Sequence, residues 1–132
     1  MADELAGEIV VDDFRESFHM SADYWGAEEY VQSWRRSFEV LLSGEEARSC
    51  FVSSITDPEN TNFIMMWPLH RRGDLVFVQN SILFLAELEE PFSALEPWRS
   101  VGPRETVSED GDRVSEWSCP LDDVRNFFHM TR

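Results

Sequence analysis

Cysteine is scarce in this sequence: Cys50 and Cys119 are its only two cysteines among 132 residues. Neither lies in a CxxC motif or a metal-spaced cluster, so the pattern argues against a disulfide framework and against a zinc site. We therefore expect both thiols to be small buried groups of a protein that works in the reducing cytoplasm.

Long apolar segments are missing as well. No apolar run approaches the roughly 20 residues that a membrane-spanning helix needs. The first residues, MADELAGEIVVDDF, contain no basic stretch followed by an apolar one, which is what a secretion signal requires. We therefore expect a cytoplasmic protein with no membrane contact. Its length suits one domain over residues 1–132, with residues 1–7 as a loose tail.

Recognisable catalytic motifs are also lacking. The three histidines, His19, His70 and His129, lie far apart, and no HExxH motif or GxxxxGK loop occurs. Scattered histidines are more often surface or partly buried residues than parts of a site. We therefore expect no catalytic residue, no cofactor and no metal ion, and predict that the protein is not an enzyme. A triad assembled from distant residues is the alternative that this pattern leaves open.

Basic residues are few. Lys plus Arg total 11 against 26 Asp plus Glu, which gives a formal net charge of -15. A charge of this sign opposes binding to phosphates, so it argues against direct nucleic-acid contact and favours a basic protein partner. Acidity that serves solubility alone is an equally common explanation.

The acids form three short clusters that border aromatic residues. Aromatic anchors surrounded by charge are typical of protein interfaces, although a charge run is more often only a solvated face. We predict that partner-binding residues come from these clusters. They are Asp12, Asp13 and Glu16, then Asp23, Glu28 and Glu29, and finally Glu87, Glu89 and Glu90.

Aromatic residues are abundant, with ten Phe and five Trp. Aromatic residues on strands can stack single-stranded bases, and four candidates are Phe63, Trp67, Phe77 and Phe84. This suggests a single-stranded nucleic-acid-binding or regulatory module as the alternative function. The compact basic patch is only His70-Arg71-Arg72, however, so we favour core packing for these aromatics.

Two segments have helical periodicity. Tyr30, Trp34 and Phe38 recur at steps of four and predict a helix within residues 21–42, with Gly44 as its C-cap. At the other end, SEWSCPLDDVRNFFHM (115–130) predicts a helix that starts at Pro120 after Ser118 or Cys119 as cap. Its apolar stripe consists of Leu121, Val124, Phe127 and Phe128.

Strand patterns fill the rest of the chain. They comprise residues 8–18, 48–55 and 61–69, and an apolar segment at 75–88 that Gln79-Asn80-Ser81 divides into two strands or one bent strand. Three prolines predict a loop at 89–104 with one helical turn near 92–95, and Asp110-Gly111 predicts a hairpin turn. The order strand, helix, antiparallel strands, helix indicates an α+β fold.

Four segments occur in the same order in one known family. They are YWGAEEYVQSW (24–34), TNFIMMWPL (61–69), VFVQN (76–80) and SEWSCPLDDVRNFFH (115–129). With them the chain resembles the immunity proteins of bacterial contact-dependent growth inhibition (CDI) systems, of the Enterobacter cloacae type. The resemblance spans about residues 8–130. Residues that contact the toxin vary with the toxin, so the resemblance assigns none of them here.

The resemblance implies both function and fold. It implies a non-catalytic protein that binds and neutralises one cognate basic toxin domain, a nuclease that cuts ribosomal RNA. It also implies a twisted antiparallel sheet with a helix from the N-terminal half and a C-terminal helix packed on it, similar to Whirly domains. Such a fold does not itself imply nucleic-acid binding, because function depends on the site rather than on the fold.

Overall fold

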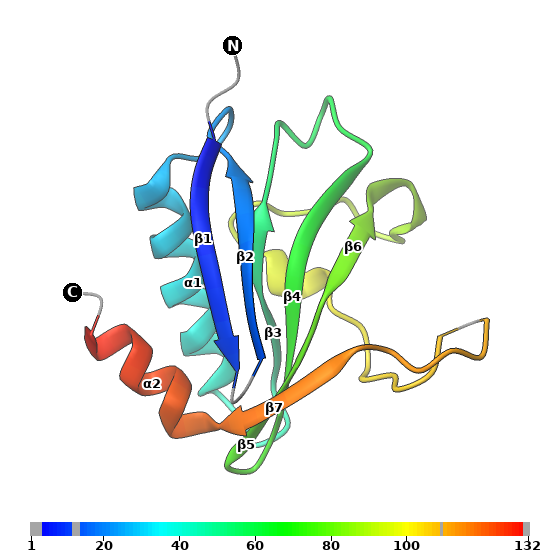
Figure 1. Cartoon of the computed structure of the whole chain (residues 1–132). Coiled ribbons are helices and arrows are strands. Elements are labelled where there is room, and N and C mark those ends of the chain that lie inside the picture. Colours follow the sequence, from blue (N-terminus) through cyan, green and yellow to red (C-terminus); the bar gives the residue numbers. More distant parts are fainter. Residues whose placement is uncertain (1–3, 12–13, 109, 131–132) are drawn as a thin grey trace.

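The computed structural model describes residues 4–11, 14–108 and 110–130, with side chains for residues 5–10, 15–108 and 110–125. Along the chain lie β1 (Glu4–Val11), β2 (Phe14–Ser21), α1 (Ala27–Leu41), β3 (Arg48–Ser54), β4 (Phe63–Arg72), β5 (Leu75–Gln79), β6 (Ser81–Phe84), the 3₁₀ turns η1 (Leu85–Glu87) and η2 (Pro97–Ser100), β7 (Glu116–Pro120) and α2 (Leu121–Met130) (Figure 1). Two antiparallel sheets and two helices confirm the predicted α+β class.

The first two strands form a hairpin of their own, in which Glu4 lies opposite Ser21. The prediction of a loose tail is therefore wrong for residues 4–7, and residues 1–3 lie outside the described residues. The prediction of one strand over residues 8–18 is wrong too. Gly7 faces Phe18 in the register, and a Cβ on Gly7 would lie 2.7 Å from the Phe18 ring. The glycine therefore lets this ring pack directly on the neighbouring backbone.

The helix α1 confirms the predicted aromatic face. Tyr30 and Phe38 are buried, and the Trp34 indole donates a hydrogen bond to the Val52 carbonyl at 2.8 Å, which holds the helix against β3. At the start of the helix, the Gly26 N–H donates to the Glu29 carboxylate at 2.7 Å. This bond satisfies a backbone donor that the first helical turn leaves free.

The end of α1 differs from the prediction. Its C-cap is Leu42 rather than Gly44. The Arg71 guanidinium, which comes from β4, donates to the carbonyls of Leu41 and Gly44 at 3.1 and 3.2 Å. A cation at this position also opposes the negative end of the helix dipole. Arg71, which is distant in sequence, therefore satisfies the carbonyl groups at the end of the helix, where a local glycine cap was expected.

The main sheet has the order β3-β4-β5-β7, and β6 also pairs with β4. Leu69 lies opposite Val78 and Met66 lies opposite Ser81, so β5 and β6 keep one register across Asn80. The prediction of two strands or one bent strand is confirmed for residues 75–84, but residues 85–87 form the 3₁₀ turn η1 instead. The continuous register also means that alternate residues of β4 can be assigned to the two faces of the sheet.

One face of this sheet is covered by α1 and the hairpin. Phe38 packs in a core cluster with Trp67 and Leu69 of β4, and Phe18 of the hairpin packs against the same cluster. The opposite face is crossed by residues 97–105, where η2 contacts β3. The predicted burial of β4 on both faces is confirmed for residues 66–69.

The last strand leads directly into α2. Leu121 is buried in the main core cluster and Val124 packs against it, as predicted. The start of the helix was predicted wrongly, since Pro120 is the final residue of β7 and Ser118 and Cys119 are strand residues. Of the predicted apolar stripe, the side chains of Phe127 and Phe128 lie outside the described residues.

Two glycines with positive φ make turns. Gly73 has φ 60° between β4 and β5, and Gly111 has φ 86°. Gly111 confirms the predicted turn, and Val107 pairs with Arg113 across it. The helical turn of the proline-rich loop begins at Pro97 rather than near residues 92–95, so that prediction is wrong.

Candidate functional site

The cysteines and histidines do not form a reactive centre in the described part of the chain. Both cysteines are buried, as predicted, and burial raises the pKa of the Cys50 thiol to about 12. His19 is exposed on β2, whereas His70 is buried on β4 and burial lowers its pKa. The side chain of His129 lies outside the described residues. Among the described residues, no group of three or more His, Cys, Asp or Glu could hold a metal ion.

The three acidic clusters lie in three separate places (Figure 1). Their described members lie on β2, near the start of α1 and beyond the end of β6. Asp12 and Asp13 lie outside the described residues, and Glu16 is half-buried. Asp23, Glu28, Glu29, Glu87, Glu89 and Glu90 are exposed. The structure therefore does not bring the predicted partner-binding residues together into one surface.

An exposed apolar patch lies where β4 pairs with β6. Phe63 lies opposite Phe84, and Met65 lies opposite Ile82. Directly paired residues point to the same side of a sheet, and so do residues two apart on one strand. The exposed fraction is 47% for Phe63, 51% for Phe84, 39% for Met65 and 48% for Ile82. We call Phe63, Met65, Ile82 and Phe84 the β4–β6 patch.

The β4–β6 patch corrects the prediction that the strand aromatics are core residues. Trp67 is buried, as predicted, but Phe63 and Phe84 are not. By alternation along β4, Phe63 and Met65 share the face of Trp67, which α1 and the hairpin cover. The 15 residues of α1 span about 22 Å, whereas the ten residues of β4 span about 33 Å. The strand is thus longer than α1, which packs mainly on the neighbouring strand β3.

Acidic residues flank this patch. The Leu85 N–H donates to the Asn62 carbonyl at 3.0 Å, so the two connections at 55–62 and 85–90 meet beside the patch. Neither connection contains an arginine or a lysine. Their acids, which we call the acid rim, are Asp57, Glu59, Glu87, Glu89 and Glu90. The third predicted cluster therefore adjoins an apolar surface that sequence patterns had assigned to the core.

A polar cluster on the opposite face of the sheet was not predicted. The Arg104 guanidinium donates to the two carboxylate oxygens of Glu116 at 2.8 and 2.6 Å. It also lies 3.9 Å from the centre of the Phe77 ring. The Gln79 amide donates to Glu116 at 2.9 Å. These bonds lower the pKa of Glu116, with the Arg104 bond as the largest cause. The cluster ties the loop to the sheet, and its residues lie too far apart in sequence to form a motif.

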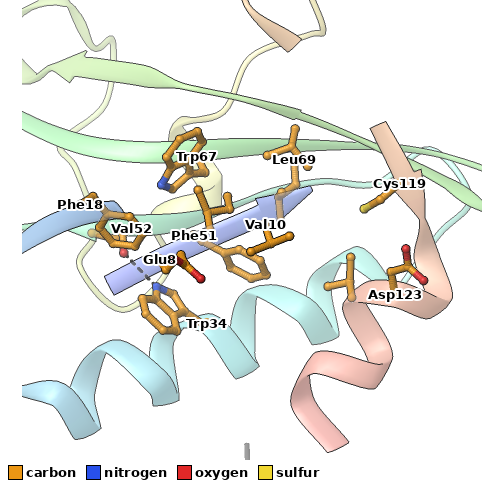
Figure 2. Close-up of a pocket in the computed structure, with 13 residues that line it drawn as sticks. Glu8, Val10, Phe18, Trp34, Phe51, Val52, Trp67, Leu69, Cys119 and Asp123 are labelled. Atoms are coloured by element: carbon orange, nitrogen blue, oxygen red, sulfur yellow. Dashed lines mark hydrogen bonds between the residues drawn. The ribbon is translucent and has the colours of Figure 1, made fainter. Parts of the chain in front are cut away.

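A cavity of about 150 Å³ lies between the hairpin, α1, the sheet and α2. Its lining is mainly apolar and aromatic, including Trp34, Phe51 and Trp67, with the carboxylates of Glu8 and Asp123 also present (Figure 2). The hydrogen bond of the Trp34 indole to Val52 crosses one side of it. Few polar groups converge on this space, so its geometry fits a gap between packed layers better than a catalytic pocket.

The basic patch His70-Arg71-Arg72 is largely occupied by contacts within the fold. Arg71 is turned toward the end of α1 and also donates to the Gly73 carbonyl at 2.7 Å. His70 is buried, which leaves Arg72 as the exposed member of the three. Neither helix of the described chain has the length and apolar content that crossing a membrane requires.

Known proteins similar to this chain point to one family. The family described as the CdiI N-terminal domain matches residues 20–127. The immunity protein CdiI of Enterobacter cloacae subsp. cloacae is 36% identical over 121 residues, which are 92% of this chain and 82% of that protein. A chain of the CdiA-CT/CdiI toxin and immunity complex from Enterobacter cloacae superposes with a TM-score of 0.87, at 34% identity over 96% of this chain and 86% of that chain. These similarities confirm the resemblance seen in the sequence, and the chain belongs to the CdiI N-terminal domain family.

Proposed function

We propose that this protein is an immunity protein that binds the toxic CdiA-CT domain of a contact-dependent growth inhibition system and neutralises it. The observation that carries this proposal is the likeness to a chain of the CdiA-CT/CdiI toxin and immunity complex, which covers 96% of this chain with a TM-score of 0.87. Because the likeness extends over nearly the whole chain, it includes both helices and the main sheet.

The proposal extends to the kind of toxin and the mode of inhibition. The toxin is a basic nuclease that cuts ribosomal RNA, and one immunity protein binds one toxin domain in the cytoplasm. The formal net charge of -15 supports this choice, because an acidic surface is attracted to the basic cleft through which a nuclease admits phosphates. Occupying that cleft would block RNA without any chemistry by the immunity protein.

Co-expression tests the proposal. The CdiA-CT domain encoded beside the gene for this chain is induced in Escherichia coli with this protein or with an unrelated immunity protein as control. We expect growth only with this protein, and a one-to-one complex by light scattering of the purified mixture. Loss of growth and absence of a complex in both cases would overturn the immunity function. Intact ribosomal RNA in the unprotected cells would overturn only the assignment of the toxin as a ribosomal-RNA nuclease.

A further inference from the structure

We propose that the β4–β6 patch is the apolar centre of the toxin-binding surface, and that the acid rim forms its charged border. The occupant is a toxin domain that places an apolar anchor within a basic surface. This inference rests on the proposed immunity function and adds to it the location of the interface.

The patch is built on a firm support. Ile64, between Phe63 and Met65 on β4, is only 1% exposed. It belongs to a core cluster that includes Met20 of β2 and Tyr30 of α1, and Leu85 and Phe92 pack against this cluster from the following loop. Ile64 therefore anchors β4 in the core, while the patch side chains on either side of it are exposed. A preformed surface of this kind loses little conformational entropy when a partner docks, which favours affinity.

The composition of the patch fits the centre of an interface. It combines two phenylalanines with a methionine and an isoleucine, and aromatic residues and methionine are enriched at such centres. Strand pairing makes the four side chains contiguous, and contiguous exposed apolar surface marks interaction sites. Other exposed apolar residues, such as Leu95 and Val107, come from separate segments outside this pairing.

The charge around the patch selects the partner. Glu59, Glu87, Glu89 and Glu90 of the acid rim are exposed. The Asp57 carboxylate is engaged locally, since it accepts the Glu59 N–H at 3.0 Å and the Asn60 amide at 2.7 Å. The acid rim would repel the phosphates of a nucleic acid that tried to stack on Phe63 and Phe84. It attracts a basic protein and increases the rate at which the two meet.

Asp23, from the second predicted cluster, is linked through hydrogen bonds to the strand beside the patch. Ser54 of β3 pairs with Met65, and its hydroxyl accepts the Ser21 N–H at 3.1 Å. The Ser21 hydroxyl accepts the Asp23 N–H at 3.3 Å. This chain of contacts brings the start of the second predicted cluster toward the patch.

Substitutions on the patch provide the test. The double variant Phe63→Ser with Phe84→Ser removes both aromatic side chains from exposed positions. The matched control is Leu95→Ser with Val107→Ser, since these residues are 72% and 51% exposed and lie outside the patch. We expect the patch variant to lose about 30-fold or more in affinity for the CdiA-CT domain, as at interface hot spots, and the control to bind like the wild type. Growth protection should follow affinity.

Charge reversal tests the rim separately. Glu87→Lys, Glu89→Lys and Glu90→Lys together should slow association with CdiA-CT and weaken its dependence on salt, because rim charges act mainly on the encounter rate. The control is Glu45→Lys with Glu46→Lys, two exposed acids between α1 and β3. The control has two reversed charges rather than three, so the change in association rate is compared per reversed charge.

The outcomes separate this inference from the proposed function. If the wild type does not bind CdiA-CT, the proposed function fails. If the wild type binds and the patch variant binds equally well, only the interface assignment is overturned. Binding of single-stranded RNA that the patch substitutions abolish would also overturn it, as would a wild-type dimer that they dissociate.

Hydrogen exchange on the unmodified protein provides a readout that does not depend on how the variants fold. Addition of CdiA-CT should slow exchange at residues 63–65 and 82–84 and in the connection at 85–90. Slower exchange elsewhere, with these segments unchanged, would overturn the inference.

Discussion

Tyr30 shows how one side chain can join three parts of this fold. It is fully buried on α1. Its hydroxyl donates to the Ser21 carbonyl at 2.6 Å, at the end of the hairpin, and accepts the Ile55 N–H at 3.1 Å, just after β3. Burial is the largest cause of its raised pKa. The aromatic steps in the sequence predicted that this ring is buried, but they carried no information on the two backbone groups that its hydroxyl satisfies.

Replacing this hydroxyl should be costly. We expect Tyr30→Phe to lower the free energy of unfolding by about 1–3 kcal/mol, because it leaves a buried donor and a buried acceptor without their partner. Urea denaturation measures the change. Tyr24→Phe is the control, since Tyr24 is 44% exposed, and it should leave the midpoint unchanged. Equal stability of the two variants would contradict the role assigned to Tyr30.

Glu116 provides a prediction on pH. Its pKa in the folded protein is lowered, chiefly by the hydrogen bond from Arg104. A carboxyl group with a lowered pKa stabilises the fold above its unfolded pKa, and that contribution is lost as pH falls through the folded value. Glu116→Gln should therefore be less stable than the wild type at neutral pH, and the difference should shrink as pH falls below the usual range for Glu.

Thermal melts over a pH series measure this difference. Glu105→Gln is the control, because the Glu105 side chain is exposed and only its backbone carbonyl accepts the Gln79 amide. It should follow the wild type at every pH. A difference between Glu116→Gln and the wild type that stays constant with pH would contradict the prediction.

At the scale of elements, sequence patterns predicted the helix and strand divisions that depend on neighbouring residues. Aromatic residues spaced four positions apart predicted α1. The polar residues Gln79-Asn80-Ser81 predicted the division of β5 from β6. The hairpin of β1 and β2 was missed because the sequence between the two strands contains no glycine of the kind that marks a tight turn. Exposure of Phe63 and Phe84 was missed because alternation along a strand does not show how far the layer above it extends.

The junction of β7 and α2 provides a prediction at this scale. Leu121 is the first residue of α2, it is buried, and its N–H donates to the Asp74 carbonyl at 2.7 Å. Leu121→Ala should reduce the free energy of unfolding by about 2–5 kcal/mol through the lost packing and the cavity left behind. Asp122→Ala, at a side chain that is 77% exposed, should cost less than about 1 kcal/mol. Denaturant unfolding of the two variants makes the comparison, and similar losses would mean that α2 is not anchored through Leu121.

At the scale of the whole molecule, charge opposes the fold that the core stabilises. A formal net charge of -15 on 132 residues produces repulsion between carboxylates, because 26 Asp and Glu residues face only 11 basic residues. The composition predicted this repulsion and the preference for a basic partner. It did not predict which of the acids border an apolar surface, because that depends on the contact between residues 62 and 85.

Salt should therefore stabilise the free protein. We expect the melting temperature to rise as sodium chloride increases from low to physiological concentration, since screening weakens the repulsion between exposed carboxylates. The control is a variant in which Glu45, Glu46 and Glu59 are replaced by Gln, which should begin with a higher melting temperature and respond less to salt. A melting temperature that does not change with salt would show that repulsion is unimportant to stability.

The position of β7 near the end of the chain determines when the main sheet can be completed during synthesis. Its residues 116–120 pair with β5 at residues 75–79, so the outer edge of β5 stays open while the ribosome adds the segment between them. At roughly 5–20 residues per second, this delay lasts a few seconds in each chain. During that interval the nascent sheet exposes an unpaired strand edge, which is where wrong pairing begins. A chain that is still being synthesised therefore lacks the completed sheet, and only finished chains present the whole fold to a partner.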